Sequence, residues 1–310
     1  MQDDDGVTQA AGGGGPARDA AHWLAALELG TADYDAFERW RGADPRHALA
    51  FARAYAHAEA VSKLAAPDQM VTPAPLSRRR LLRGAAAGLV VLGSGSVFFG
   101  SRAMAWTHAR TAIGEFQKVA LPDGSHVVLN TDTEVAWRFE RDRRHIRLKR
   151  GEVALDLLPG APARFTVADS VAALTPGRFV VRMRPRDVDL LVLRGKALVD
   201  GRTAVGAREL ASLTSAAPRV QSTSDERISR ATAWQSGEIE FDDTRLADAV
   251  DEYNRYLARR IVIDAAPLQD LRVGGRFATA DPDVFLKALT LGFDVQVSQR
   301  DGAFHLSQKI

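Results

Sequence analysis

Residues 134–157 read EVAWRFERDRRHIRLKRGEVALDL, and apolar side chains occupy every second position along much of this stretch. Val135, Trp137 and Phe139 alternate with other residues, and the alternation returns at Ile146 and Leu148 after a charged segment. Side chains of a β-strand point alternately to opposite faces, so a period of two indicates strands with one buried face. The stretch therefore predicts short β-strands and no helix.

The same period extends outward to residues 107–218. Turn signals interrupt it about every ten residues, among them Pro-Asp-Gly at 122–124, Pro-Gly at 159–160 and Pro-Gly at 176–177. Short alternating strands separated by such turns are typical of all-β domains. The pattern predicts an all-β domain over residues 107–218, built either as a sandwich or as a solenoid-like stack.

Residues 234–310 follow a different pattern, after a polar stretch that we expect to act as a bridge. An amphipathic helix runs from Leu246 to Leu257 between two strand patterns, and a second helix opens at Asp281-Pro282 and ends at Gly292. Strand patterns flank this helix on both sides. The resulting order, β-α-β-β-α-β-β, predicts a small α+β domain.

Upstream of the strands, residues 77–106 read SRRRLLRGAAAGLVVLGSGSVFFGSRAMAW. Eighteen positions from Gly84 to Ser101 carry no charge. As a helix they would span about 27 Å, close to the thickness of a bilayer core. Five glycines make the alternative, a buried helix of a soluble domain, unfavourable. The stretch predicts one transmembrane helix over residues 84–105, preceded by a linker and basic flank over residues 67–83.

Flanking charge sets the expected orientation of this helix. Arg78, Arg79, Arg80 and Arg83 precede it, whereas Arg102 alone follows. By the positive-inside rule the preceding residues stay in the cytoplasm and the chain from about residue 106 is exported. The flank also resembles a twin-arginine export signal, which a receptor reads. The alternative is that these arginines only set the topology. Both interpretations place the residues before the helix in the cytoplasm and export the residues after it.

The first 83 residues begin with a glycine-rich, acidic leader at 1–17, which we expect to be disordered. Residues 18–66 predict three short helices, with Thr31 or Asp33 as one N-cap and Asp44 as another. So small a bundle can be completed by a partner, in which case part of its apolar set is an interface. The candidate partner-binding residues are Trp23, Leu24, Leu27, Phe37, Trp40 and Phe51.

A search for catalytic chemistry finds no motif. The chain has no cysteine, and its seven histidines show no close metal-ligand spacing. There is no phosphate-binding loop, nucleophile elbow or dinucleotide fingerprint. We therefore expect no enzyme, metal or cofactor. Residues 1–76 carry 11 acidic and 6 basic side chains, a net charge of −5, and the chain offers no basic patch typical of nucleic-acid binding.

Several segments in a fixed order resemble FecR-type sigma-factor regulators. They are GEFQKVALPDGSHVVLNTDTEVAWRF (114–139), RHIRLKRGEVALDL (144–157), ARFTV (163–167), VLRGKALV (192–199), WQSGEIEF (234–241) and RLADAVDEYNRY (245–256). The three predicted helices over residues 18–66, here called the head, are similar to the family's N-terminal anti-sigma module. Residues 234–310 are similar to a secretin/TonB short domain. The resemblance covers about residues 18–310.

This resemblance implies a single-pass protein of the bacterial inner membrane, with a cytoplasmic N-terminus and a periplasmic C-terminus. Its head would bind an extracytoplasmic-function sigma factor, and its periplasmic part would meet the signalling domain of a TonB-dependent outer-membrane receptor, commonly in response to an iron chelate. Regulatory proteases are implied as further partners. Tyr253, Arg255 and Tyr256 are the receptor-contact candidates. The competing hypothesis is a membrane-anchored periplasmic binding or scaffold protein without a sigma-factor partner.

Some FecR-like proteins cleave themselves at a Gly-Thr bond, by attack of the threonine hydroxyl on the preceding carbonyl. The matching stretch here is LTPGRF, from Leu174 to Phe179, and the pair at that place is Pro176-Gly177. Gly177 has no hydroxyl, so the nucleophile is missing. We therefore expect the exported part to remain a single chain.

Overall fold

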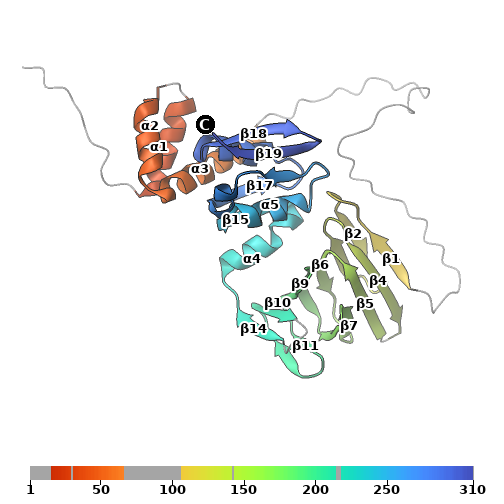
Figure 1. The fold of residues 1–310 in the computed structure, drawn as a ribbon. Coiled ribbons are helices and arrows are strands. Elements are labelled where there is room, and N and C mark those ends of the chain that lie inside the picture. The colour runs from red at the N-terminus through yellow and green to blue at the C-terminus, as the bar shows by residue number, and fades with distance from the viewer. Residues whose placement is uncertain (1–14, 29–30, 66–105, 142, 214–217, 310) are drawn as a thin grey trace, which may run out of the picture.

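The computed structural model describes residues 15–28, 31–65, 106–141, 143–213 and 218–309. Residues 1–14 of the leader predicted over 1–17, the linker and basic flank, and the transmembrane helix over residues 84–105 lie outside the described residues. The end of the leader, predicted to be disordered, is instead helical from Pro16. Within the described ranges, every helix is too short or too polar to cross a bilayer. Four parts follow in chain order: a helical head, a β-body, a short connector and a C-terminal module (Figure 1).

Three helices make up the head, as predicted. They are α1 (Pro16–Glu28), α2 (Tyr34–Ala43) and α3 (Pro45–Ala65). α3 contacts both of the other helices. Three helices of this length bury little apolar surface by themselves, so further contacts are needed for a stable fold.

The β-body is a pair of seven-stranded sheets. One sheet has the order β1 (Thr107–Arg110), β4 (Glu134–Glu140), β5 (Arg143–Arg150), β7 (Ala163–Val167), β8 (Ser170–Leu174), β11 (Ala197–Val199), β12 (Thr203–Val205). The other has the order β14 (Arg219–Ser222), β13 (Glu209–Leu213), β10 (Val188–Arg194), β9 (Gly177–Met183), β6 (Glu152–Leu157), β3 (His126–Leu129), β2 (Gln117–Ala120).

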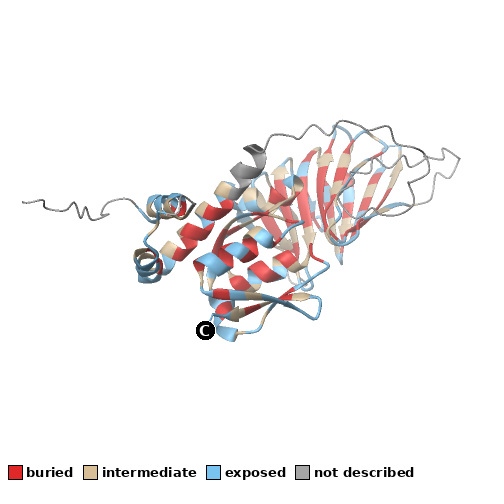
Figure 2. Cartoon of the chain, turned by 90° about the horizontal axis from the view of Figure 1, so that it is seen from above, coloured by how far each residue is buried: buried red, intermediate tan, exposed pale blue. Residues whose placement is uncertain are grey.

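Strand numbers rise in one direction along both sheets, because the chain moves back and forth between them as it advances from one end to the other. Neighbouring strands are antiparallel apart from β5 and β7, which pair in parallel. One apolar core, which includes Leu129, Phe165 and Phe179, fills the space between the sheets. Buried and exposed positions alternate along the strands (Figure 2), which confirms the period of two. The domain is thus a sandwich of two sheets, and its strands are added in succession from one end to the other, as in a solenoid. It combines both architectures that the sequence pattern allowed.

Two turns explain parts of the motifs found in the sequence. At the β2–β3 turn, the Asp123 carboxylate accepts hydrogen bonds from the backbone N–H and the hydroxyl of Ser125, at 3.0 and 2.8 Å. Arg144 of β5 pairs with the same carboxylate at 3.0 Å. At the β5–β6 turn, Gly151 has a φ of 86°, and a side chain there would collide with Thr133. Glycine is therefore required before Glu152.

The β-body ends later than predicted. We placed its boundary at residue 218 and expected a polar bridge, but β14 at residues 219–222 pairs with β13 as an edge strand. The bridge then folds as α4 (Asp225–Thr232), capped by the Ser224 hydroxyl, and the 3₁₀ helix η1 (Ala233–Ser236). All four side chains of β14 are exposed, so they show no hydrophobic alternation by which the strand could be recognised.

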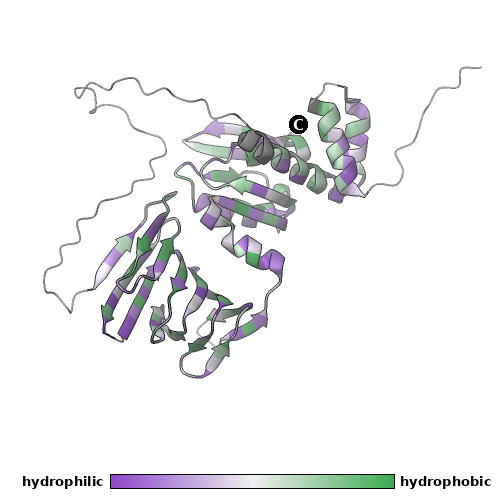
Figure 3. Cartoon of the chain, turned by 180° about the vertical axis from the view of Figure 1, so that it is seen from behind, coloured by the Kyte–Doolittle hydropathy of each residue, from purple (hydrophilic) through white to green (hydrophobic). Residues whose placement is uncertain are grey.

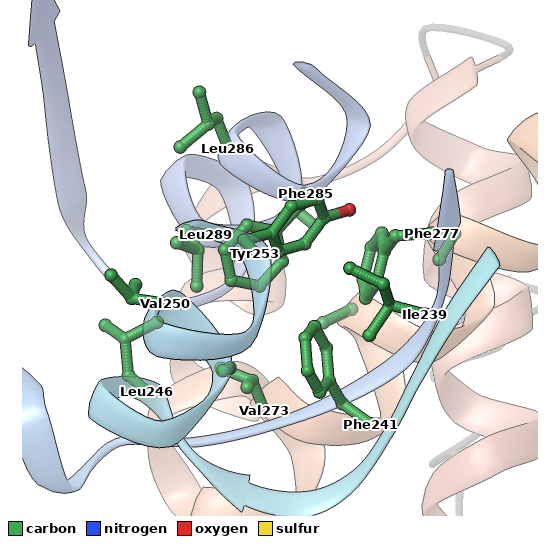
Figure 4. Close-up of a cluster of buried hydrophobic side chains, with 14 of the residues drawn as sticks. Ile239, Phe241, Leu246, Val250, Tyr253, Val273, Phe277, Phe285, Leu286 and Leu289 are labelled. Carbon is green, nitrogen blue, oxygen red and sulfur yellow. The ribbon is translucent and has the colours of Figure 1, made fainter. Parts of the chain in front are cut away.

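The C-terminal module has the predicted order of elements. They are β15 (Glu238–Arg245), α5 (Leu246–Asn254), β16 (Ile261–Ile263), the 3₁₀ helix η2 (Ala266–Asp270), β17 (Arg272–Ala278), α6 (Asp283–Gly292), β18 (Val295–Arg300) and β19 (Ala303–Gln308). β15 pairs with β17, and a separate sheet has the order β16-β19-β18. The apolar faces of α5 and α6 meet in a core of leucines and aromatic rings (Figure 4).

α3 lies against the C-terminal module and contacts β17 and α6. Its buried residues join those of the module in one continuous apolar core. The view from behind shows the head beside the module and away from the β-body (Figure 3). A membrane span over residues 84–105 would place these two parts on opposite sides, so this contact and the predicted single span exclude each other within one chain at one time.

Candidate functional site

A cluster of aromatic rings, drawn from all three helices, holds the head together. The ring of Trp23 in α1 lies 5.7 Å from that of Phe37 and 6.2 Å from that of Trp40, both in α2. Phe37 in turn lies 4.9 Å from Phe51 of α3. Tilted and offset rings at such separations attract one another beyond the area they bury. The cluster therefore helps to fix how the three helices cross.

Two aspartates mark the helix boundaries beside this cluster. Asp33 Oδ1 accepts hydrogen bonds from the backbone N–H groups of Asp35 and Ala36, at 3.0 and 3.1 Å, where α2 begins. Asp44 Oδ1 accepts one from the Arg46 N–H at 2.8 Å, where α3 begins. Side-chain oxygens at these positions satisfy N–H groups that have no partner within the helix. Asp33 was one of two predicted caps for α2, and Asp44 the predicted cap for α3.

The six predicted partner-binding residues divide into two sets. Leu24, Phe37 and Phe51 are buried and serve the core of the head. Trp23, Leu27 and Trp40 are partly buried and pack against that core from its edge. Only the second set presents apolar surface to a partner while the head stays folded.

Trp40 joins core and edge. Its indole stacks on the His47 ring with centroids 4.7 Å apart and planes 4° apart, and His47 Nδ1 lies 2.7 Å from the Trp40 carbonyl oxygen. Its own Nε1 is buried and has no hydrogen-bond partner among the described residues. A buried N–H without an acceptor costs free energy, so the stacking on His47 and the packing against the aromatic cluster must offset this cost.

Tyr34, at the start of α2, is an apolar surface residue that the sequence analysis missed. Its side chain is 66% exposed, more than that of any other large hydrophobic residue in the described ranges. Exposed aromatic side chains are enriched where proteins bind one another. Its place directly after the cap residue was the available signal, because a helix start faces solvent in a small bundle.

A second cluster, here called the junction cluster, joins the β-body to the C-terminal module. Glu152 of β6 and Arg182 of β9 come from the β-body, whereas Glu252 and Arg255 come from the end of α5. Arg182 pairs with Glu252 at 2.5 Å, and Arg255 pairs with Glu252 at 2.6 Å and with Glu152 at 2.8 Å. The four charges therefore alternate in sign and are compensated within the cluster.

Burial and charge act in opposite directions on the junction cluster. Burial alone would raise the pKa of Glu252, but the guanidinium groups of Arg182 and Arg255 outweigh it and leave that pKa below its usual value. Burial likewise opposes the charge on Arg255, yet Glu152 and Glu252 raise its pKa above the ordinary value. Glu252 and Arg255 thus stay charged at neutral pH, and neither can lose its partner without leaving a buried charge.

Neutral groups extend the junction cluster. Asn130 Nδ2 donates to Glu152 Oε2 and to the Tyr256 hydroxyl, both at 2.9 Å. The Thr131 hydroxyl donates to the Arg255 carbonyl at 2.9 Å and accepts from the Gly114 N–H at 2.8 Å. Burial raises the pKa of Tyr256, which remains a neutral phenol. The end of α5 is therefore bonded both to β6 and to the loop that follows β1.

The three predicted receptor-contact residues lie inside the molecule. Tyr253 is fully buried among Phe241, Phe277 and Phe285 in the core of the C-terminal module (Figure 4). Tyr256 is 4% exposed, and Arg255 is engaged in the junction cluster. In this arrangement the three residues stabilise the fold and present little surface to a receptor, because the end of α5 turns them toward the interior.

A groove with a volume of about 580 Å³ opens beside the junction cluster. Its walls come from the second sheet, α4, β15 and α5, and include Val180, Leu191, Arg227, Ile239 and Glu252. Acidic, basic and apolar side chains all line the groove, so its lining does not favour one class of ligand. Within the described ranges, no three His, Asp or Glu side chains gather closely enough to hold a metal ion.

Gly177 opens β9, beside the β8–β9 turn. Thr175 precedes it by two residues, and the Thr175 hydroxyl accepts from the Lys196 N–H at 2.9 Å. A side chain on Gly177 would collide with the Arg194 carbonyl. The remaining predicted functional residues, Arg78, Arg79, Arg80 and Arg83, lie outside the described residues.

Two family models match this chain, one in the β-body and one in the head. The model of the FecR protein family matches residues 107–198, which form most of the β-body. The model of a domain of unknown function, DUF4880, matches residues 18–61, which form the head. A search of curated proteins found no match to this chain.

Two crystal structures of a candidate anti-sigma factor from Parabacteroides distasonis ATCC 8503 have a similar fold. One, at 2.50 Å resolution, is 20% identical with a TM-score of 0.55, and the similarity covers 66% of this chain and 99% of that chain. The other, at 1.65 Å resolution, is 19% identical with a TM-score of 0.54 and covers 65% and 99%. At this identity the likeness establishes the fold.

Proposed function

Because the chain belongs to the FecR protein family, we propose that it regulates a sigma factor that binds to its helical head. One observation carries the proposal: the head matched over residues 18–61 keeps two indoles, Trp23 and Trp40, at the exposed edge of its aromatic cluster. Apolar surface of this kind on a small bundle is typical of a protein-binding site. The name of the structurally similar P. distasonis protein supports the same function.

The proposed partner is an extracytoplasmic-function sigma factor. Residues 1–76 carry a net charge of −5, whereas sigma factors present basic surfaces that bind DNA. Complementary charge accelerates the encounter of two proteins and favours the right partner. Binding of the head would therefore compete with promoter DNA for the sigma factor.

The proposed location is the bacterial inner membrane, crossed once by residues 84–105. Four arginines before this segment and one after it favour a cytoplasmic head and an exported β-body. The exported part would receive a signal from a TonB-dependent outer-membrane receptor, with an iron chelate as the external cue. Regulatory proteases would then release the head.

Capture of the partner with the tagged full chain tests this function. The protein is solubilised in mild detergent, and the captured proteins are identified by mass spectrometry. Recovery of a sigma factor, together with reduced transcription from its promoters when the chain is supplied in vitro, is the expected result. Repeated capture without any sigma factor would refute the proposal and favour a scaffold role.

Tyr34→Ala provides the matched variant. Tyr34 is 66% exposed, so its replacement should weaken sigma binding by at least ~10-fold while the head stays folded. Leu198→Ala removes another exposed apolar side chain, 42% exposed, from the β-body and should leave binding unchanged. Equal affinities for both variants would exclude the start of α2 from the interface.

A further inference from the structure

The face of α3 that lies on the C-terminal module is closely fitted to it. A Cβ atom on Gly274 of β17 would come within 2.9 Å of Leu49 Cδ1 and would also collide with the Arg53 side chain. A Cβ atom on the neighbouring Gly275 would lie 3.2 Å from Ala56 Cβ. Both separations are tighter than ordinary van der Waals contact, so larger residues would push α3 away. The two glycines of β17 thus form a seat for the helix.

Charged groups border this seat. Arg41, whose side chain is 7% exposed, pairs with Asp294 at 2.6 Å and donates to the Leu291 carbonyl at 3.2 Å. Arg53 pairs with Asp242 of β15. Basic groups of the head therefore face acidic groups of the module at two separate places, which fixes the register of the contact.

The same face of α3 is apolar between these pairs. Leu49, Ala52 and Ala56 recur at spacings of three and four residues, so they form one stripe along the helix. All three are buried, and the module provides their cover. If the module is removed, the stripe becomes an exposed patch that favours another protein partner.

A span over residues 84–105 removes this cover, because it separates head and module by a membrane. We infer that the stripe of α3 has two alternative covers: the C-terminal module in a chain that has not been inserted, and the sigma factor in an inserted chain. The inference rests on the proposed function, which supplies the second cover. It makes sigma binding conditional on membrane insertion, since a closed chain has its docking stripe occupied.

An engineered disulfide tests this inference directly. A Cβ atom built on Gly292 of α6 lies 3.8 Å from Ala52 Cβ, which is the mean separation in disulfides. Because the chain has no cysteine, Ala52→Cys combined with Gly292→Cys gives a single defined pair. Each single variant is the control, since it carries the same substitution and cannot cross-link within the chain.

In purified full chain, oxidation should cross-link the double variant and remove its affinity for the captured sigma factor in proportion to the fraction cross-linked. Reduction should restore binding, and the single variants should bind equally with or without oxidant. Unchanged binding by the cross-linked chain would overturn the inference, as would failure of the pair to cross-link. If the unsubstituted chain itself binds no sigma factor, the proposed function fails, whatever the disulfide does.

A second measurement separates the two states in cells. Oxidant applied to isolated inner membranes should leave the double variant uncross-linked, whereas chain from the soluble fraction should cross-link. Cross-linking of membrane-inserted chain would show that both parts lie on one side, which would overturn both the single span and the inference.

Discussion

Loss of one carboxylate from the junction cluster should loosen the C-terminal module from the β-body. Glu252→Gln keeps the side-chain volume but removes the charge that faces Arg182 at 2.5 Å and Arg255 at 2.6 Å. Breaking a buried ion pair on one side costs about 3–5 kcal/mol. The charged side chains involved are about one-fifth exposed, so we expect the lower end, about 3 kcal/mol.

Calorimetry of the full chain measures this loss. For a unit the size of residues 107–309, about 2–4 °C of melting temperature is lost per kcal/mol, so the shift should be about 6–12 °C. Arg182→Gln combined with Glu252→Gln should cost less than the sum of the single changes, by at least ~1 kcal/mol. Asp156→Asn is the matched control, because its pair with Arg194 is mostly exposed and should contribute less than about 0.5 kcal/mol. A Glu252→Gln shift no larger than that of the control would refute the reasoning.

Acid should act on the same cluster. The pKa of Glu252 is lower in the folded protein than in the unfolded chain, where it is about 4.3. Its contribution to stability is therefore complete above that unfolded value and is lost as pH falls through the folded pKa. The Glu252→Gln variant should lack this part of the acid dependence, and equal slopes of stability against pH below pH 4 would contradict the assignment.

Three further predictions concern topology and integrity. Alkaline phosphatase fused after Trp106 should be active and fused after Leu64 inactive, and activity at both points would exclude a single span. Replacement of Arg78 and Arg79 by lysine should impair export if a twin-arginine receptor reads the flank, whereas unchanged export would leave them as topology charges. The purified chain should remain intact on prolonged incubation, because the hydroxyl expected at Gly177 is missing, and spontaneous fragments that meet near residue 176 would disprove this.

Much of the architecture could be predicted because its signals are local. Hydrophobic periods of two and of three to four residues distinguished the β-body from the C-terminal module and gave the correct order of elements in the module. β14 was missed because all its side chains are exposed, so burial imposes no alternation on them. Its place in the sheet depends on hydrogen bonds to β13, which any sequence without proline can make.

The functional surfaces were harder to predict. Tyr253 and Tyr256 were assigned to a receptor surface, although Tyr253 continues the apolar stripe of Leu246, Ala249 and Val250 and is therefore a core position. Glu152 and Arg255 are about one hundred residues apart in sequence, and a charged residue gives no local sign that its partner lies on another domain. Contacts of this kind depend on how finished domains meet, which local patterns do not encode.

The hydrogen bonds around Thr131 have a mechanical consequence. They connect the end of α5 to Gly114, in the loop directly after β1, and β1 itself begins at residue 107. Force applied to the C-terminal module therefore reaches the loop after β1 through two hydrogen bonds, and β1 is the edge strand with which the β-body begins. A movement of the module relative to the β-body would therefore act on this first strand directly, before it acts on the strands at the far end of the same sheet.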